Sequence, residues 1–392
     1  MTAASVRAKT AAPTLIGIQA LRFVAAMLVV VMHGSQMAAE RLGAEGSRHD
    51  YWVFGAFGVH IFFVISGVVM ALSTRDWRPG PGVIQRFMVR RVIRILPMYW
   101  LATTLKLASV LAVPAAALHT DLSFGHLSLS YLLVPHQDSF GEPFPLLGVG
   151  WTLSYEFFFY FVFAALVALG LPLISTSFAL FFLMNVADQV FDLRDQLTFF
   201  RLFSPLLFEF SAGLIVARLL LSGWRLPAPL ALGAAVLGFY GAYNWVIGPL
   251  GFWHNLQNSV WAFLVVIGVT SLEPLIGRHI PRWLRLLGDA SFALYLFHPF
   301  VMAGGALFVK LGARTPATAL IAASLLSVLL SVAIYKFVEQ PMTEWLRRRV
   351  EPRRPPSAPA PDGGHARAET GRAPADTPRA SGDAPKPGSR PA

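Results

Sequence analysis

Cysteine is absent from the 392 residues, which excludes disulfide bonds, thiolate metal sites and a cysteine nucleophile at once. Charged side chains are also scarce, at 14% of the chain against 55% hydrophobic residues. So little charge does not cover a soluble globule. Basic residues outnumber acidic ones, for a net charge of +11. They fall mostly between apolar runs, where they indicate orientation in a membrane and argue against a nucleic-acid partner.

Apolar runs of spanning length fill most of the chain, and ~20 such residues cross a bilayer. We count them at about 15–37, 52–72, 97–114, 148–169, 173–190, 199–221, 228–247, 256–272, 289–308 and 316–338. The fold class predicted is all-α, a polytopic integral membrane protein with about ten transmembrane helices. An even count puts both termini on one side, and the basic loops fall on that same side. The N- and C-termini are therefore expected to be cytoplasmic.

Composition divides the chain into three parts. Residues 1–14 are polar and are expected to form a short cytoplasmic segment. Residues 15–345 form the membrane domain. Residues 346–392 are rich in Pro, Ala and Arg without apolar periodicity, which predicts a disordered basic cytoplasmic tail.

The first apolar run carries Arg22 and His33 inside it. Ionisable residues inside a span cost at least ~2.5–3.5 kcal/mol and are functional candidates. Eleven helical residues turn by ~1100° and rise by ~16 Å, so the two side chains share one face near opposite sides of the membrane. We predict that they connect an inner pocket with an outer reaction centre. The alternatives are snorkelling of Arg22 to the surface and a packing role for His33.

Four arginines precede the third run. Arg86, Arg90 and Arg94 recur every four residues, and Arg91 with Arg94 forms an R-x-x-R, so on a helix they cluster on neighbouring faces. Guanidinium groups bind phosphate bidentately, which predicts a site for a phosphorylated cosubstrate. Anchoring of the span by topology or by anionic lipid is the alternative.

The fourth run opens with Trp151 and contains Glu156. Glu156 lies ~12 Å deep in its run, a depth that His33 can share, so we predict that the carboxylate orients the imidazole for general-base chemistry. A structural ion pair or a neutral buried acid is the alternative.

In the ninth run Ser291, Tyr295 and His298 are spaced to share one face, and interhelical hydrogen bonding is the alternative to a site there. Glu209 and Glu339 are further candidates. No pattern predicts a metal site.

At these residues the sequence resembles the acyltransferase-3 family of membrane acyltransferases, over about residues 14–345. The first block is I-Q-A-L-R-F-V-A-A-M-L-V-V-V-M-H, and the second is G-V-H-I-F-F-V-I-S-G. R-F-M-V-R-R-V-I-R-I-L-P-M-Y-W resembles the arginine-rich block. G-V-G-W-T-L-S-Y-E-F-F-F-Y is similar to the branch that decorates bacterial exopolysaccharides, and F-A-L-Y-L-F-H-P and V-E-Q-P resemble the closing blocks. The second block usually reads G-V-D, and this chain has His60 in that place.

The resemblance implies a membrane O-acyltransferase that moves an acyl group, by expectation acetyl from acetyl-CoA, to a glycan hydroxyl. Its acceptor would be an exopolysaccharide or a lipid-linked oligosaccharide, in the inner membrane of a bacterium and beside polysaccharide-synthesis machinery. The implied catalytic residues are His33, Arg22 and Glu156. We assign Arg86, Arg90, Arg91 and Arg94 to acyl-CoA, and Trp151, Tyr155 and His298 to the acceptor. A transporter or flippase for glycan intermediates and a macrolide or small-molecule O-acyltransferase are the alternatives.

Overall fold

The computed structural model describes residues 15–42, 52–113, 120–193, 198–245, 252–310, 312 and 315–350. Within these ranges every regular element is a helix and no strand occurs, so the predicted all-α class is confirmed. The expected cytoplasmic segment 1–14 and the tail from residue 351 onward lie outside the described residues.

Seven helical segments in the described part are long and apolar enough to cross a membrane. They are built from α1 (Ile16–Leu42), η2 with α2 (Val53–Ala56, Phe57–Thr74), α3 (Val83–Ala112), η3 with α6 (Gly148–Gly150, Trp151–Leu169), α7 (Leu173–Phe191), α11 (Phe252–Ile276) and α15 (Pro316–Ile334) with its continuation. Two shorter helices, α12 (Arg282–Asp289) and α13 (Ser291–Ala303), meet at a bend of 67° and make an eighth segment if they are taken as one span.

The expected count of ten spans is not confirmed. Helix α9 (Leu207–Leu221) has 15 residues, fewer than the ~20 that cross a bilayer, and α10 (Ala228–Trp245) is not among the seven. Because the cytoplasmic placement of both termini came from an even count, it stays a prediction.

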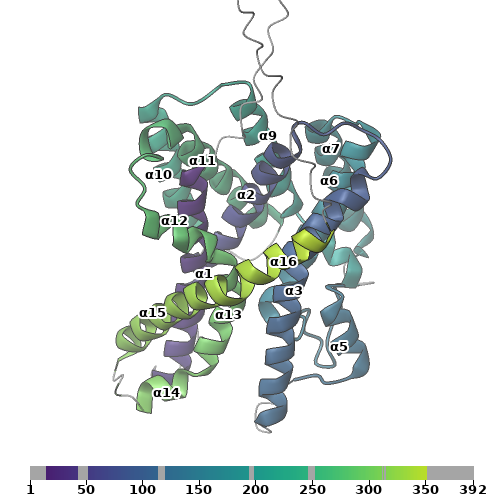
Figure 1. The fold of residues 1–392 in the computed structure, drawn as a ribbon. Helices are drawn as coiled ribbons and strands as arrows, with labels where there is room; N and C mark the ends of the chain where they lie inside the picture. Colours follow the sequence, from purple (N-terminus) through teal and green to yellow (C-terminus); the bar gives the residue numbers. More distant parts are fainter. Residues whose placement is uncertain are drawn as a thin grey trace, which may run out of the picture. The chain divides into compact units, whose positions relative to one another are not determined.

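Shorter elements complete the order: α5 (Phe124–Tyr131), η4 (Thr198–Leu202), α14 (Gly305–Lys310), the π-helical turn η5 (Tyr335–Glu339) and α16 (Gln340–Val350). Helix α15, η5 and α16 follow one another without a break, and Figure 1 shows them as one long yellow-green rod. The helical domain therefore extends to Val350, five residues beyond the boundary expected at 345.

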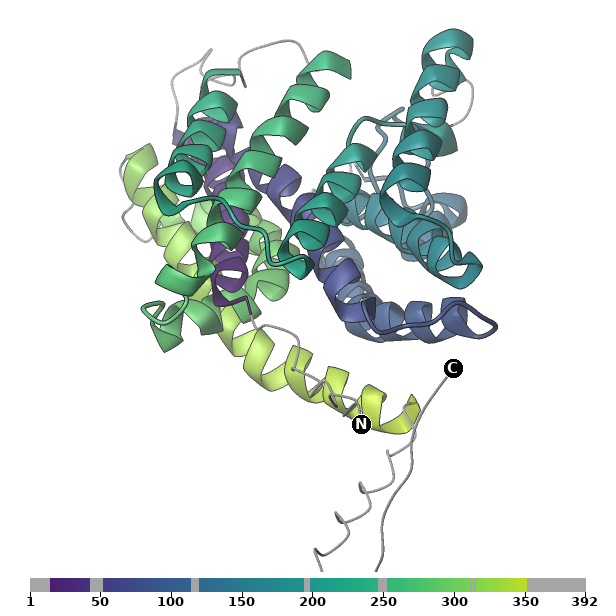
Figure 2. The same cartoon turned by 90° about the horizontal axis from the view of Figure 1, so that it is seen from above.

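Helix α1 packs against α2, α11, α12, α13 and α15. Figures 1 and 2 both show α15 beside the purple α1. The approach of α2 is very close, because a Cβ added at Gly58 would lie 2.1 Å from the carbonyl oxygen of Ala25. Small residues at helix interfaces permit such contacts inside a membrane.

The N-terminus of α1 is capped by a residue from far along the chain. The backbone N–H groups of Ile16 and Gly17 each donate to the Glu273 carboxylate of α11, at 2.7 Å. The first N–H groups of a helix have no partner within it, and a carboxylate also complements the positive end of the helix dipole. Glu273 therefore fastens the start of the helix that carries Arg22 and His33.

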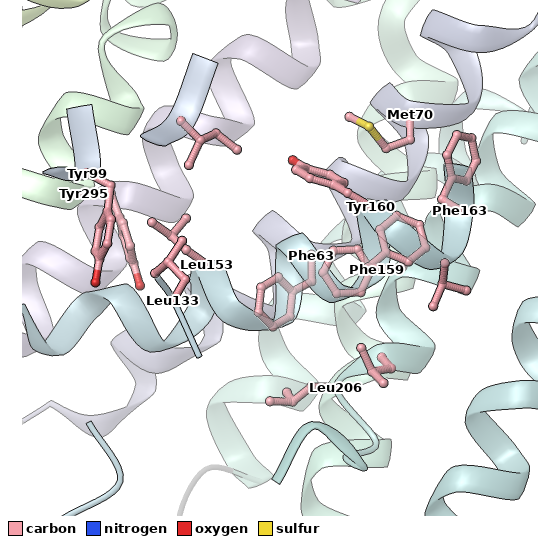
Figure 3. Packing of buried hydrophobic residues seen from close by; sticks show 14 of the residues in the cluster. Phe63, Met70, Tyr99, Leu133, Leu153, Phe159, Tyr160, Phe163, Leu206 and Tyr295 are labelled. Carbon is pink, nitrogen blue, oxygen red and sulfur yellow. The ribbon is translucent and has the colours of Figure 1, made fainter. Parts of the chain in front are cut away.

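The core beside the site is aromatic (Figure 3). Phe210 of α9 stacks on Phe159 of α6 with ring centroids 4.2 Å apart, and on Phe63 of α2 at 4.7 Å. All three side chains are nearly excluded from solvent. These contacts fix α2, α6 and α9 against one another. Helices α2 and α6 also supply most of the lining of the cavity that contains Arg22, Arg91 and Arg94, described below.

Candidate active site

Two cavities open in the described part of the helical domain. The first, which we call the arginine cavity, encloses about 820 Å³ with its solvent-open space, and its charged lining residues are Arg22, Arg91, Arg94 and Glu156. The second, the histidine cavity, encloses about 2740 Å³ on the same measure. Its titratable and charged lining residues are His33, His60, His136, Lys106, Arg201, Tyr155 and Tyr295. The residue types predicted for a donor and for a reaction centre thus occur in separate, neighbouring spaces.

Arg22 and His33 lie on one helix but line different cavities, Arg22 the arginine cavity and His33 the histidine cavity. Tyr295 and Val59 line both, so they form the common wall. The Tyr295 hydroxyl donates to the Val149 carbonyl at 3.0 Å and contacts the Thr152 hydroxyl at 2.9 Å. The two contacts of this hydroxyl anchor the wall. The sequence did not predict them, because the spacing linked Tyr295 only to Ser291 and His298.

The four arginines of α3 separate into two pairs. Arg91 and Arg94 line the arginine cavity. Arg86 and Arg90 are exposed, and their guanidinium carbons lie 5.7 and 5.5 Å from the centre of the Trp77 ring. The four-residue spacing predicted a single cluster. The structure instead places Arg91 and Arg94 in the cavity, and Arg86 and Arg90 over the Trp77 ring outside its lining.

Arg22 in the arginine cavity interacts electrostatically with nearby acidic side chains. Arg22 lies 3.3 Å from the Gln19 side-chain oxygen and interacts electrostatically with Arg94, Glu339 and Asp289. Glu339 belongs to the π-helical turn, and its Oε2 is buried without a hydrogen bond to any residue that the structure describes. The sequence left Glu339 as a further candidate or a boundary charge. In the structure its carboxylate interacts electrostatically with Arg22.

Glu156 does not orient His33, contrary to the sequence-based prediction. Its carboxylate accepts hydrogen bonds from Ser66 at 2.8 Å and from Tyr160, and it lines the arginine cavity. Equal depth along two spans says nothing about which way each side chain points around its helix. The physical reason for the error is therefore rotational, because α6 turns Glu156 toward α2 and α3.

His33 is oriented by His298 instead. The His298 Nδ1 lies 3.1 Å from the Leu294 carbonyl oxygen, and its Nε2 lies 3.0 Å from the His33 Nδ1. A carbonyl only accepts, so the His298 proton is on Nδ1; in the neutral ring Nε2 must then accept from the His33 Nδ1–H. The His33 Nε2 is left with its lone pair, and no protein hydrogen bond to it occurs in the described ranges. This is the tautomer that a general base requires.

The three residues assigned to the acceptor have different positions. Trp151 and Tyr155 both line the histidine cavity, with ring centroids 5.7 Å apart. The Tyr155 hydroxyl donates to the Arg201 carbonyl at 2.5 Å. His298 is 1% exposed and lines neither cavity. Its place against His33 makes it a positioning residue, and the shared face with Ser291 and Tyr295 did not reveal this partner.

Residues 134–149 contribute part of the wall of the histidine cavity, and the segment before them is tied down by polar contacts. The backbone N–H groups of Ser123 and Ser139 donate to Asp121 at 2.8 Å each. These bonds, that of Ser123 above all, lower the pKa of Asp121 to about 2. The His136 Nε2 and His126 Nδ1 lie 2.9 Å apart. Burial first and then the neighbouring His136 lower the pKa of His126.

A second oriented histidine was not predicted. His60 of α2 lines the histidine cavity, and its Nδ1 is hydrogen-bonded to Glu209 of α9. The Ser259 hydroxyl of α11 donates to the same carboxylate oxygen at 3.1 Å. Two titratable residues in apolar runs are a signal for such a pairing, and both were visible as G-V-H and as an isolated Glu209. Nothing in the spacing linked 60 with 209.

Comparison with known proteins gives consistent results. A family model described as an acyltransferase domain matches residues 15–336. The chain is 38% identical over 317 residues to the exopolysaccharide production protein ExoZ of Rhizobium meliloti (strain 1021), covering 78% of this chain and 95% of that protein. It is 26% identical over 389 residues to the acyltransferase MdmB of Streptomyces mycarofaciens. That match covers 89% of this chain and 95% of MdmB. No solved structure is significantly similar.

Proposed function

Because this chain belongs to the acyltransferase-3 family, we propose that it is a membrane O-acyltransferase that transfers an acyl group, acetyl in the simplest case, from acyl-CoA to a glycan hydroxyl. The observation that carries the proposal is the pair of cavities with Tyr295 and Val59 in common. One cavity has cations suited to an anionic donor, and the other has an imidazole lone pair suited to an acceptor hydroxyl.

On the donor side, Arg22, Arg91 and Arg94 hold the phosphates of coenzyme A, since guanidinium forks bind phosphate oxygens bidentately. Arg86 and Arg90, which lie over the Trp77 indole, bind the nucleotide end of the coenzyme. The apolar lining from α2, including Phe62 and Phe63, takes the pantetheine arm. The thioester reaches the histidine cavity at the Tyr295 wall.

At the reaction centre, the His33 Nε2 takes the proton of the acceptor hydroxyl as the oxygen attacks the thioester carbonyl carbon. The carbon–sulfur bond then breaks, and the coenzyme leaves as a thiolate. His298 keeps the His33 ring in the reactive tautomer. The same lone pair suits the other course open from sequence, in which His33 takes the acyl group before the sugar does.

On the acceptor side, the aromatic rings of Trp151 and Tyr155 offer a surface for a sugar ring. We propose an exopolysaccharide or lipid-linked oligosaccharide acceptor, supported by the name of the Rhizobium relative, and a place in the bacterial inner membrane beside the synthesis machinery. Asp and Glu are missing from the described lining of this cavity, which also contains Lys106 and Arg201.

The test uses purified protein in detergent with [14C]acetyl-CoA and the surface polysaccharide of a host strain from which this gene is deleted. Label in the polysaccharide and release of coenzyme A support the proposal; neither, with protein that still binds acetyl-CoA, refutes it. Omitting the acceptor separates the two courses for His33, because a carrier gains the mass of one acetyl group and a base does not.

A transporter or flippase remains the alternative from another class, because intramembrane Arg, His and Glu also suit proton-coupled transport. Movement of a labelled lipid-linked glycan across proteoliposomes without acyl-CoA would favour it. An assay with a small hydroxylated acceptor in place of polysaccharide tests the small-molecule alternative.

A further inference from the structure

The bond between His60 and Glu209 joins α2 to α9 deep inside the protein. Glu209 is 0% exposed and His60 is 8% exposed. The Glu209 Oε1 is bound by both the His60 Nδ1 and the Ser259 hydroxyl. The Glu209 Oε2 is buried and has no hydrogen-bond partner in the part of the chain that the structure describes. Burial of an oxygen without a partner disfavours a net charge on the His60–Glu209 pair, and we therefore start from a neutral pair that shares one proton.

Counting hydrogens shows what the neutral pair presents to the cavity. If the shared proton is on the imidazole, both ring nitrogens carry hydrogen. If it is on the Glu209 carboxyl, the His60 Nδ1 accepts it and the ring hydrogen is on Nε2. Both arrangements leave an N–H at the His60 Nε2. That atom makes no protein hydrogen bond within the described ranges, and His60 lines the histidine cavity.

The two oriented imidazoles of the cavity are therefore opposite in kind. His298 leaves His33 with an acceptor nitrogen, whereas Glu209 leaves His60 with a donor nitrogen. Acyl transfer needs one of each, a base for the attacking hydroxyl and a donor for the negative charge that develops on the carbonyl oxygen.

Resting on the function proposed above, we propose that the His60 Nε2–H is the oxyanion donor, and that Glu209 is the residue that keeps it protonated and aimed. As the sugar oxygen attacks, the carbonyl π electrons move onto oxygen, which accepts a hydrogen bond from the His60 Nε2. When the carbon–sulfur bond breaks, that electron pair re-forms the carbonyl. The proton of His60 stays on His60 throughout, and the hydroxyl proton is on His33.

Three substitutions test the assignment. His60→Leu removes the donor and should lower kcat by ~10²–10³, the effect of losing one oxyanion donor, with little change in the KM for acyl-CoA. His60→Gln keeps an N–H donor and should recover most of that loss. Glu209→Gln removes the acid; with its amide oxygen in the Oε1 position, where the Ser259 hydroxyl donates, the Gln accepts from the His60 Nδ1–H, so a neutral His60 turns its lone pair to the cavity and kcat falls as in His60→Leu. His279→Leu, at an exposed histidine, is the matched control.

The pH profile distinguishes a donor from a base or a packing residue. If His60 is the donor, the rising limb of kcat with pH persists in His60→Leu and His60→Gln, because the base is His33. Equal losses in His60→Leu and His60→Gln, or loss of the rising limb in both, overturn the assignment. If wild-type protein transfers label but His60→Leu has wild-type kcat, the donor role fails and the acyltransferase function stands; absence of transfer by wild-type protein refutes the function itself.

Discussion

The two cavities are built differently. Every residue that lines the arginine cavity belongs to one of five helices, α1, α2, α3, α6 and α13. The histidine cavity takes much of its wall from non-helical or 3-10 segments, including residues 134–149 and 201–206. Helices hold a fixed constellation of side chains, whereas loops tolerate change and carry specificity. If the proposed function holds, the acyl donor would bind between rigid helices on one side of Tyr295, and the acceptor would bind against a more adaptable surface on the other side.

The residues that orient the reactive groups differ in the same way. In the arginine cavity Glu156 is held by the Ser66 and Tyr160 hydroxyls, and the charge of Arg22 is opposed by those of Glu339, Asp289 and Glu156. In the histidine cavity neutral contacts set the His33 tautomer, and the His60 ring is set by a buried acid. The first cavity is therefore suited to holding an ion and the second to moving a proton.

Substitution of His33 should have the largest effect. His33→Ala removes the imidazole whose Nε2 lone pair is exposed by the hydrogen bond to His298. Acetyl transfer should therefore fall by at least ~10³, because both the base and its geometry are lost. Binding of acyl-CoA should persist, because His33 is not in the arginine cavity. Transfer is measured with labelled acetyl-CoA and binding by calorimetry, and the amount of protein in membranes is the control. A His33→Ala protein with wild-type activity contradicts the catalytic role.

The paired substitution Arg91→Ala with Arg94→Ala breaks the donor side. Each charge-assisted hydrogen bond contributes about 1.5–3 kcal/mol, so the Kd for acyl-CoA should rise by ~10²-fold or more. The same changes at Arg86 and Arg90, which are exposed and screened, should raise Kd by ~10-fold or less. Equal effects from the two pairs would show that the division between cavity and surface has no functional meaning.

Opening the wall should blur the distinction between the cavities. Tyr295→Ala removes the ring and the hydroxyl bond to the Val149 carbonyl, which admits water to the thioester. We expect transfer to fall by ~10-fold while hydrolysis of acyl-CoA without acceptor rises. Tyr295→Phe keeps the ring and should lie between this variant and wild type. A ratio of hydrolysis to transfer that is unchanged in Tyr295→Ala refutes a separating wall.

The smallest effect concerns the segment beside the histidine cavity. The pKa of Asp121 is about 2 in the folded protein and about 3.8 in a model peptide, so the unfolded chain binds more protons between these values and stability rises with pH. The contribution is fully present above about pH 4 and is lost as pH falls through about 2. Thermal unfolding of Asp121→Asn should accordingly show a smaller drop in Tm from pH 5 to pH 3 than wild type does; an equal drop argues that these hydrogen bonds are immaterial.

The helical class and the candidate residues on single helices followed from the sequence, because apolar run length and 3.6-residue periodicity are local properties. Arg22, His33, Arg91, Arg94, Trp151 and Tyr155 all line one of the two cavities. The span count is not confirmed, in part because hydropathy continues across 199–221 whereas helix α9 begins only at Leu207.

Pairing between helices did not follow from the sequence. The partner of His33 was expected to be Glu156 and is His298, 265 positions along the chain. The bond between His60 and Glu209 spans 149 positions. Such pairs depend on the rotation of each helix about its axis, which packing contacts such as that of Gly58 with Ala25 decide. A single sequence shows which residues are unusual in a span but not which of them meet.

The carboxylate of Glu273 at the start of α1 has a further consequence. Arg22 and His33 both lie on this one rigid helix, so whatever sets the axial position of α1 sets the position of both side chains at once. The two hydrogen bonds to Glu273 therefore fix the axial position of Arg22 and of His33 together, and a shift of α11 along α1 would displace both side chains by the same distance.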